Sequence, residues 1–247
     1  MPFTTSSTQR VPGLNCHVTA DAVRRSRELY NLLTEDTNRP SIQDHLQNLQ
    51  HIFVSHGVDR KLGIHLKHGH FQLSENQILL GTTSTKPLCR WARKRHIDDA
   101  DLNNIHGHIF VVQDGELHPY EYHDGRYTES IPTEFLDAFI KYTTDHSLCS
   151  EVALQILLPE FQNRCFSEIP FEDQTVMLET EHLNGLRPGN VTGWTFSPVG
   201  CTAGETHAET GNGHEKYNVG APLPNDVRVV CGILIDRGLL HPSCLAA

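Results

Sequence analysis

The sequence lacks the short signatures that usually mark nucleotide binding or a nucleophilic serine. It contains no phosphate-binding P-loop, no G-x-G-x-x-G pattern, no G-x-S-x-G elbow and no H-E-x-x-H pair. None of its seven cysteines forms a C-x-x-C pair, so the strongest zinc-ribbon and dithiol redox signatures are also missing. ATP, nicotinamide and flavin chemistry therefore gain no support from the sequence.

Long apolar runs are missing as well. No stretch of the 247 residues approaches the ~20 apolar residues of a membrane helix, and the first residues lack the apolar block and cleavage site of a secretory signal. An odd number of scattered cysteines is typical of free thiols. We therefore expect a cytoplasmic protein that does not bind a membrane.

Positive charge is scarce too. The formal net charge is −10, and the one notable basic cluster, "CRWARKRH" at residues 89–96, is typical of a solvated helix face. An acidic chain is a poor match for a phosphate backbone. We expect no nucleic-acid partner.

The apolar periodicity predicts a single α+β domain over residues 1–247. Residues 19–36 and 39–57 are typical of two amphipathic helices capped by Thr19 and Ser41, and they form a predicted N-terminal helix pair in a helical part over residues 18–57. Residues 58–247 predict a mixed, mainly antiparallel sheet with one or two further helices, one of them at 131–148.

Three later segments have their own predictions. The stretches "EVALQILLP" (151–159) and "DVRVVCGILID" (226–236) indicate strands buried on both faces. Residues 184–225 are rich in Gly, Pro, Asn and Thr without clear periodicity, which predicts a long loop that is functional or disordered.

Histidine is the residue that the chain has in excess, with 17 copies. Three of them lie in the apolar segment "KLGIHLKHGHFQL" (61–73). Because residues i and i+2 share a face of a strand, His68 and His70 can present their rings to one ion, with Gly69 between them easing backbone approach. The same periodicity turns His65 to the other side. A second pair, His106 and His108, has the same central glycine and is a further candidate.

The stretch "GCTAGETHAETGNGHEKYN" supplies the groups that would complete a metal site. Within fourteen residues it holds thiol, carboxyl and imidazole groups from Cys201, Glu205, His207, Glu209 and His214. Thiolate, imidazole and carboxylate are the ligands of zinc. A set made of His68, His70 and either Glu205 or Glu209 would instead suit non-haem Fe(II).

Two segments, "LKHGHF" and "CTAGETHAETGNGH", resemble the fungal cyclopenases, which are described as haemocyanin-like zinc proteins. Cyclopenases contract the ring of cyclopenin or cyclopenol to give viridicatin or viridicatol, with loss of carbon dioxide and methylamine. The resemblance implies a zinc site formed by His68, His70, Cys201 and His207, with Glu205 or His214 as the proton carrier. The chain has none of the H-x-x-x-H pairs of true haemocyanins, so no haemocyanin fold is implied.

The residues and the resemblance together predict a zinc-dependent, redox-neutral lyase or isomerase of secondary metabolism. Its expected partner is a small aromatic metabolite in a pocket lined by Phe71, Trp194 and Phe196. The chain is compatible with a homo-oligomer. Two other functions stay open at this point: a non-catalytic, zinc-stapled binding protein and a non-haem Fe(II) oxygenase. The participation of His65, His106, His108 and His214 in the site also stays open.

Overall fold

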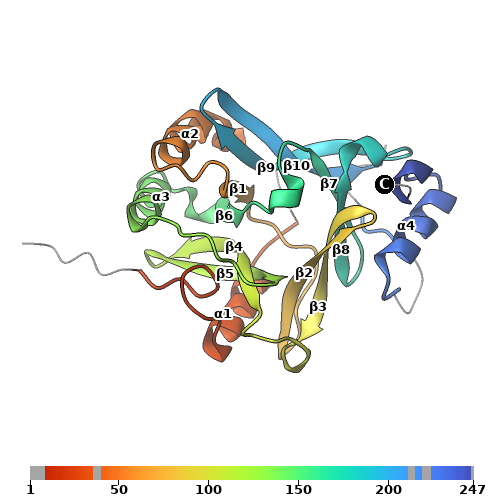
Figure 1. The fold of residues 1–247 in the computed structure, drawn as a ribbon, viewed down its shortest axis with the longest axis horizontal. Coiled ribbons are helices and arrows are strands. Elements are labelled where there is room, and N and C mark those ends of the chain that lie inside the picture. Colours follow the sequence, from red (N-terminus) through yellow and green to blue (C-terminus); the bar gives the residue numbers. More distant parts are fainter. Residues whose placement is uncertain (1–8, 36–39, 211–214, 219–223, 246–247) are drawn as a thin grey trace, which may run out of the picture.

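The computed structural model describes residues 9–35, 40–210, 215–218 and 224–245. In these residues, ten strands close into one barrel (Figure 1). The strands are β1 (Leu62–Leu66), β2 (Gln77–Thr85), β3 (Leu88–His96), β4 (Ile105–Gln113), β5 (Glu116–Asp124), β6 (Val152–Ile156), β7 (Phe166–Pro170), β8 (Gln174–Glu179), β9 (Arg187–Ser197) and β10 (Gly200–Glu209). Around the barrel they follow the order β1-β6-β4-β5-β2-β3-β8-β7-β10-β9, and β1 completes the ring by pairing with β9.

The sheet is mixed and mainly antiparallel, as the sequence predicts. Two pairs of neighbouring strands are parallel, β2 with β5 and β7 with β10. The β7–β10 pair matters most for function, because its register places His207 opposite Glu168. Since parallel neighbours cannot be joined by a tight turn, these two residues come from segments far apart in the sequence.

The described helices lie on the outside of the barrel (Figure 1). They are α1 (Ala20–Asn31), α2 (Leu46–Ser55), α3 (Thr133–Asp145) and α4 (Val227–Asp236), with short 3-10 helices at Pro40–His45, Ile97–Asp99, Leu148–Ser150, Pro159–Phe161, Thr180–His182 and Pro242–Leu245. The predicted cap of the first helix is confirmed, because the Thr19 side chain accepts a hydrogen bond from the backbone N–H of Ala22. None of the described helices has the length and apolar character needed to cross a membrane.

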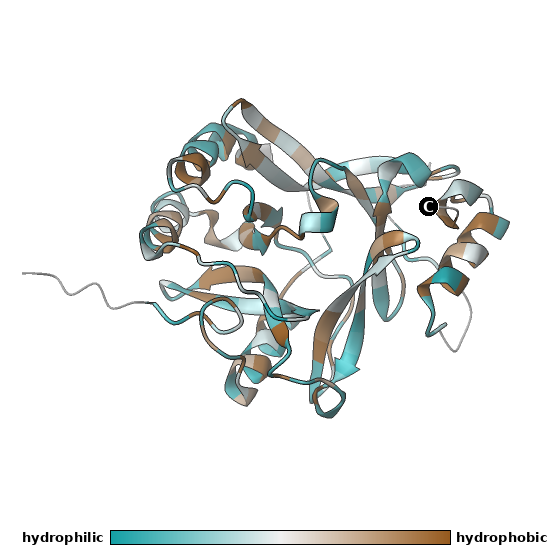
Figure 2. Cartoon of the chain, in the orientation of Figure 1, coloured by the Kyte–Doolittle hydropathy of each residue, from teal (hydrophilic) through white to brown (hydrophobic). Residues whose placement is uncertain are grey.

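The main hydrophobic clusters lie between the barrel wall and these helices. Leu62, Ile64 and Leu66 of β1 pack in one cluster with Phe53 of α2 and Phe135 of α3. A second cluster joins β3, β7 and β8 to α4, a helix along which hydrophobic and hydrophilic residues are interspersed (Figure 2). Because side chains alternate along a strand, apolar packing on the outer face leaves the other face of β1 for His65. The barrel interior is accordingly rich in buried histidines and acids.

The fold class is confirmed as α+β, but the arrangement of the first two helices differs from the prediction. Both helices form, yet α1 packs on β2 and β5, whereas α2 packs on α3, β9 and β10. They therefore do not make the expected antiparallel pair. The sequence does not predict the closure of the sheet into a barrel, which leaves neither edge exposed.

Three further segments differ from their predictions. Most of the predicted loop at 184–225 is the long β9–β10 hairpin, while 211–214 and 219–223 lie outside the described residues. The segment 226–236 is the helix α4 rather than a strand, because Val227, Val230, Cys231 and Leu234 form one buried helical stripe. The basic run at 89–96 belongs to strand β3, not to a solvated helix.

Candidate metal centre

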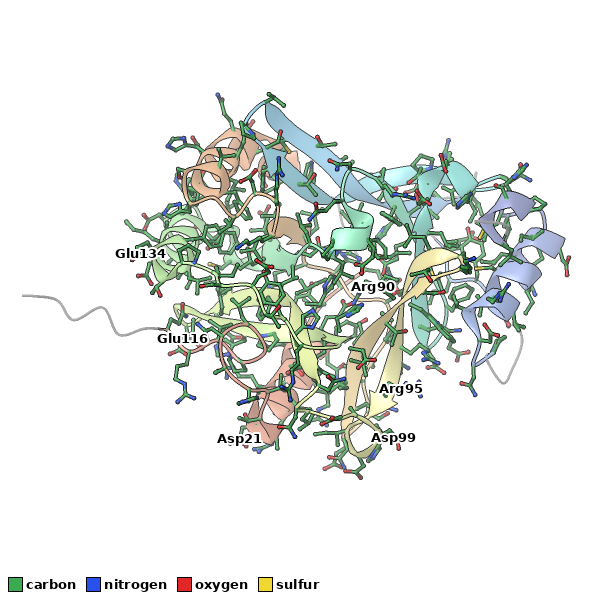
Figure 3. All side chains as sticks on the ribbon, viewed as in Figure 1. Asp21, Arg90, Arg95, Asp99, Glu116 and Glu134 are labelled. Atoms are coloured by element: carbon green, nitrogen blue, oxygen red, sulfur yellow. The ribbon has the colours of Figure 1, made fainter. Side chains whose placement is uncertain are left out.

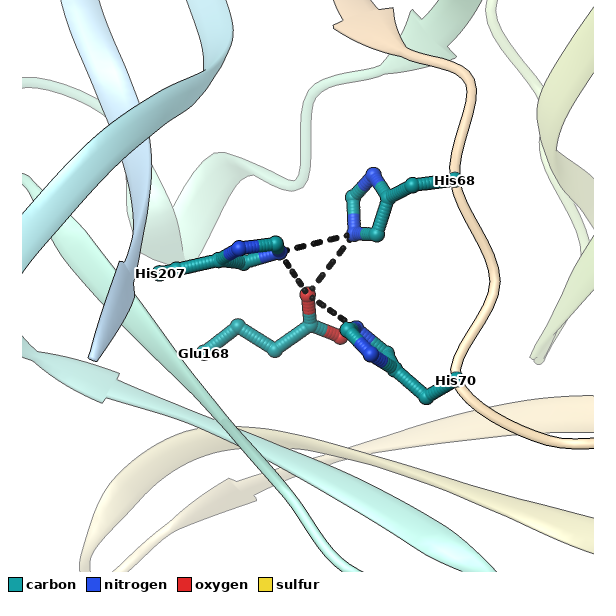
Figure 4. A group of neighbouring side chains, drawn as sticks. All are labelled: His68, His70, Glu168 and His207. Atoms are coloured by element: carbon teal, nitrogen blue, oxygen red, sulfur yellow. Dashed lines mark hydrogen bonds and ion pairs between the residues drawn. The ribbon is translucent and has the colours of Figure 1, made fainter. Parts of the chain in front are cut away.

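Four buried side chains meet inside the barrel: His68, His70, Glu168 and His207 (Figure 4). Each offers one ligand atom, and these four atoms all lie within 4.8 Å of one another. Glu168 Oε2 is 3.1 Å from His68 Nε2 and 3.1 Å from His70 Nε2. His207 Nε2 lies 3.1 Å from His68 Nε2 and 3.6 Å from Glu168 Oε2. We call these four residues the metal-ligand group.

Three parts of the chain contribute to the group. His68 and His70 follow the end of β1, so they lie on an irregular segment and not on the strand that the sequence predicts. Glu168 and His207 face each other across the parallel β7–β10 pair. The strand β9 pairs with both β1 and β10, and this pairing brings the end of β1 next to β10.

Close packing against the end of α1 and the residues that follow it shapes the histidine segment. A Cβ atom at Gly69 would come within 3.1 Å of Leu33 Cβ, so the predicted role of this glycine in close backbone approach is confirmed. The backbone N–H of His70 donates to the Tyr30 hydroxyl, 3.4 Å away. The segment therefore has little freedom to move relative to α1.

The tautomer of His68 is fixed by its neighbours. Its Nδ1–H donates to the carbonyl oxygen of Leu66 at 2.9 Å, which turns Nε2 toward the other ligand atoms. Such a hydrogen bond on the outer ring nitrogen is typical of metal-binding histidines. Without a proton or a cation at Nε2, its lone pair would face the carboxylate of Glu168. The group therefore requires positive charge at its centre.

The spacing of the four atoms fits a small divalent cation. Four N or O ligands at the usual 2.0–2.1 Å from a tetrahedral zinc lie about 3.3 Å from one another. Four of the six separations within the group, 3.1, 3.1, 3.1 and 3.6 Å, bracket this value, and all six are within 4.8 Å. The residues present therefore fit a metal ion, although the spacing does not distinguish zinc from iron.

The charges in the group keep its carboxylate ionised. Burial opposes ionisation of Glu168, but the charge of His70 and the hydrogen bonds from both neighbouring histidines outweigh it and hold the pKa of Glu168 well below its usual value. Burial lowers the pKa of His68, yet its hydrogen bond to Glu168 more than compensates and raises that pKa above the ordinary one. A buried carboxylate that stays ionised is a strong cation ligand.

Two more titratable side chains adjoin the group. The ring of His65 stacks on His68 with centroids 4.8 Å apart, so the expectation that His65 faces away from the site is wrong. His65 Nε2 lies 3.4 Å from Glu205 Oε2, and Glu205 Oε1 accepts a 2.7 Å hydrogen bond from Gln155. Burial raises the pKa of Glu205 to about 7. Burial and the nearby charge of His68 lower the pKa of His65 to about 3.

A cavity of about 300 Å³, which we call the first cavity, lies next to the group. Its aromatic lining residues are Phe161, Phe166, Trp194 and Phe196. A hollow of only about 10 Å³ lies directly against His68 and His70. Both spaces share the lining residues Arg90, Gln155, Met177 and Glu205, which therefore form a layer between the first cavity and the metal-ligand group.

Arg90 supplies the positive charge in this layer. It lies in the middle of the molecule, whereas the labelled acidic residues lie at its edge (Figure 3). Its guanidinium donates to the buried carboxylate of Glu121, and a Cβ at Gly81 would come within 2.6 Å of the guanidinium. The glycine on β2 thus makes room for the arginine, whose Nε is buried without a hydrogen-bond partner.

The structure brings together three of the four predicted zinc ligands: His68, His70 and His207. It does not bring Cys201 to them, because that residue precedes His207 by six positions on β10, about 20 Å at the rise of a strand. Cys201 packs instead against the hydrophobic cluster under α2. Of the two predicted proton carriers, Glu205 adjoins the group, and His214 lies outside the described residues.

The remaining candidates lie elsewhere. Glu209 ends β10, and His106 and His108 lie on β4, so none of the three belongs to the metal-ligand group. Among the predicted pocket residues, Trp194 and Phe196 line the first cavity. Phe71 packs in a different cluster, with Tyr30 and Leu79.

Sequence reasoning missed Glu168, the group's only carboxylate. The signal was weak but present, because "CFSEIPF" places one acidic residue inside an otherwise apolar, strand-like segment. A buried charge of this kind needs a partner or a metal.

No family model matches this chain, and no curated protein or solved structure is significantly similar to it. The function therefore has to be argued from the chemistry of the site.

Proposed function

We propose that this protein is a zinc-dependent enzyme that catalyses a redox-neutral lyase or isomerase reaction on a small aromatic molecule. The single observation that carries the proposal is the metal-ligand group lying behind the first cavity, with a layer of mainly polar side chains between them. A metal that only stabilised the fold would need no arginine and no second carboxylate beside it. Unsatisfied polar groups in such a place lower stability and are retained where they serve function.

Three imidazoles and one carboxylate would hold the metal, through His68, His70, His207 and Glu168. Bound zinc supplies Lewis acidity toward a substrate carbonyl or lowers the pKa of a water. Because zinc has no redox chemistry of its own, this choice of metal agrees with a lyase or isomerase. The resemblance to the cyclopenases supports the same choice.

The side chains of the separating layer have clear chemical roles in such a reaction. Glu205 adjoins both the first cavity and the hollow beside His68, so it can take a proton from a substrate in the cavity or return one. The unpartnered Nε–H of Arg90 can donate to a substrate oxygen and orient it. The Met177 side chain is flexible enough to move aside when the substrate passes toward the metal.

The cavity itself favours an aromatic substrate. Its walls combine Phe161, Trp194 and Phe196 with a few polar groups, and about 300 Å³ suits a molecule of two or three rings. Aromatic pairs gain stabilisation from stacked or edge-to-face contacts. Cyclopenin, which has two aromatic rings, is the first substrate to test.

The test combines metal analysis with a substrate assay. We expect purified protein to contain about one zinc per chain, and both His68→Ala and His207→Ala to lose most of it. The zinc-loaded protein incubated with cyclopenin should form viridicatin, carbon dioxide and methylamine with consumption of one water. Protein that binds no metal would refute the proposal, and zinc-loaded protein inert toward cyclopenin would leave the site but remove this substrate.

Two rival functions rest on specific observations. The hollow beside the histidines is only about 10 Å³, room for about one water, which favours a closed structural zinc site in a binding protein. His68, His70 and Glu168 also form a two-histidine, one-carboxylate set, which suits non-haem Fe(II). Iron in the purified protein, with consumption of oxygen and 2-oxoglutarate, would favour the oxygenase.

A further inference from the structure

A second cluster of possible ligand atoms lies at the end of β8, apart from the metal-ligand group. It consists of Glu179, Glu181 and His182, and one carboxylate or imidazole atom from each of them lies within 4.8 Å of the others. Glu179 is the last residue of β8, and the short 3-10 helix Thr180–His182 follows it directly. We call these three residues the 179–182 cluster.

The 3-10 turn itself brings the first and last of these side chains together. Because such a turn has three residues, Glu179 and His182 lie one above the other on the same side of it. Both residues are buried, with 8% and 7% of their surface exposed, whereas Glu181 is exposed. The cluster therefore has a buried, fixed part and one exposed carboxylate that an ion can reach from solvent.

The proton of the His182 ring can be placed from its neighbours. The backbone N–H of Ser243 donates to His241 Nδ1 at 3.2 Å, so that nitrogen carries a lone pair. The Ser243 hydroxyl lies 2.9 Å from the same nitrogen and donates its one hydrogen to it. The hydroxyl oxygen is then left to accept, so His182 Nδ1, which is 3.3 Å away, carries the proton. In the neutral ring, His182 Nε2 therefore holds a lone pair.

This lone pair lies opposite a carboxylate. His182 Nε2 is 3.7 Å from Glu179 Oε2, which is too long for a hydrogen bond. No described residue forms a hydrogen bond with this nitrogen. Two ligand atoms that are each about 2.0–2.2 Å from one zinc ion can be up to about 4.3 Å apart. The separation of Nε2 and Oε2 therefore suits two ligands of one cation better than a direct contact.

Arg164 fixes the orientation of the buried carboxylate. Its guanidinium donates to Glu179 Oε1, which leaves Oε2 facing His182. Such a hydrogen bond to the outer oxygen of a carboxylate is typical of metal ligands. The arginine balances only one of the two carboxylate charges, so the cluster keeps a negative charge that attracts a cation.

We propose that the 179–182 cluster is a second, exchangeable zinc site, with Glu179 Oε2, the Glu181 carboxylate and His182 Nε2 as its ligands. The imidazole ligand favours zinc over magnesium or calcium, which prefer oxygen ligands alone. One of the three ligands is exposed, whereas the metal-ligand group has four buried ones. The cluster therefore binds zinc more weakly and releases it during purification. This site does not depend on the reaction proposed above.

The experiment counts the zinc ions that bind to the full chain. Zinc chloride is titrated by calorimetry into protein that has been freed of metal with a chelator. We expect two equivalents per chain, of which the weaker belongs to the 179–182 cluster. His207→Ala should lose the tighter equivalent and keep the weaker one, because His207 belongs only to the metal-ligand group.

Three variants assign the weaker equivalent. Glu181→Gln removes the exposed ligand and leaves the buried part in place, so we expect a folded variant whose affinity for this zinc falls at least about tenfold. His182→Gln removes the nitrogen ligand and should have the same effect. Glu134→Gln, at an exposed position on α3, changes the net charge equally and should bind both equivalents like the parent protein. Thermal melting shows that each variant is folded.

Three outcomes would overturn the proposal. If the parent protein binds only the equivalent that His207→Ala loses, Glu179 and His182 are an ordinary ion pair. If the weaker equivalent binds unchanged in both Glu181→Gln and His182→Gln, it lies elsewhere on the chain. If an excess of magnesium displaces the weaker equivalent, carboxylates alone hold the ion and the imidazole is not a ligand.

Discussion

Glu168 is the only anionic residue in the metal-ligand group, and it contacts His68 and His70 at equal distances. Glu168→Gln keeps the side-chain size and removes the charge that attracts a divalent cation. We expect metal affinity to fall at least about tenfold. The measurement is the metal retained after dialysis against graded chelator. The exposed Glu172→Gln on the following turn should retain metal like the parent protein.

Cys201 belongs to the ligand set that the sequence predicts but not to the metal-ligand group of the structure. Because it lies at the far end of β10 and packs under α2, Cys201→Ser should leave the metal content unchanged. His70→Ala, at a position in the group, should lower it sharply. Both variants are compared by elemental analysis of the purified proteins. Metal loss in Cys201→Ser would show that the thiol is a ligand after all.

The sequence predicts which types of residue form this site better than it predicts which individual residues belong to it. His68 and His70 are recognisable because two histidines and a glycine interrupt an apolar segment. The sequence pattern does not reveal Glu168, and it predicts Cys201 as a ligand although the structure places that residue elsewhere. Membership of the site depends on strand pairing over more than 30 residues, and local patterns carry no such information. The parallel register of β7 with β10 selects Glu168, and the length of β10 removes Cys201.

At the scale of the elements, replacing glycine by alanine should have opposite effects on stability at two positions, one on a strand and one on a helix. A Cβ at Gly193 on β9 would lie 2.9 Å from Glu205 Oε2, so Gly193→Ala should displace that carboxylate and cost about 1–3 kcal/mol. A Cβ at Gly232 within α4 meets nothing within 4 Å, so Gly232→Ala should stabilise the protein by about 0.5–1 kcal/mol. Urea unfolding of the two variants measures both changes.

The same comparison has a second readout at the site. Because Glu205 adjoins the first cavity, Gly193→Ala should also alter ligand binding there, whereas Gly232→Ala should not. A stable, fully functional Gly193→Ala would show that the carboxylate has room to move.

Element types were predictable where apolar residues recur at the spacing of one face of a strand or helix. The alternation of β1 and the helical stripe of α3 follow directly from apolar spacing. The strand predicted at 226–236 is wrong because Val and Ile are frequent in strands, although the buried residues of this segment recur at helical spacing. The hairpin β9–β10 was hidden because its inward positions hold Gly, Thr, Glu and His, residues usually found in loops.

For the whole molecule, the metal should stabilise the fold. Its ligands come from the segment after β1 and from β7 and β10, so a bound ion links distant parts of the barrel. A ligand present at 100 times its Kd adds about 2.7 kcal/mol. We therefore expect chelation to lower the Tm and added metal to restore it in proportion to its concentration. His207→Ala should melt at the same temperature with and without chelator.

The buried histidines also predict how the stability of the whole molecule depends on pH. Burial lowers the pKa of His123 to about 3, and the nearby charge of Arg90 adds to the effect. The unfolded chain binds a proton at this ring near pH 6.5, while the folded protein does not, so stability is lost as the pH falls from about 6.5 toward 3. Burial lowers the pKa of His106 and His108 as well, and the three effects act in the same direction.

The contribution of His123 can be isolated by comparing how steeply the free energy of unfolding changes with pH in the parent protein and in a variant. One histidine that stays neutral in the fold contributes a loss of about 1.4 kcal/mol between pH 7.5 and pH 5.5. His123→Gln cannot take up this proton, so its stability should fall by about that much less than the stability of the parent protein over the same interval. Urea unfolding at the two pH values, with chelator throughout, gives both differences. His51→Gln, at an exposed position on α2, should show the same dependence of stability on pH as the parent protein. If His123→Gln also showed that dependence, the His123 ring would already be protonated in the fold.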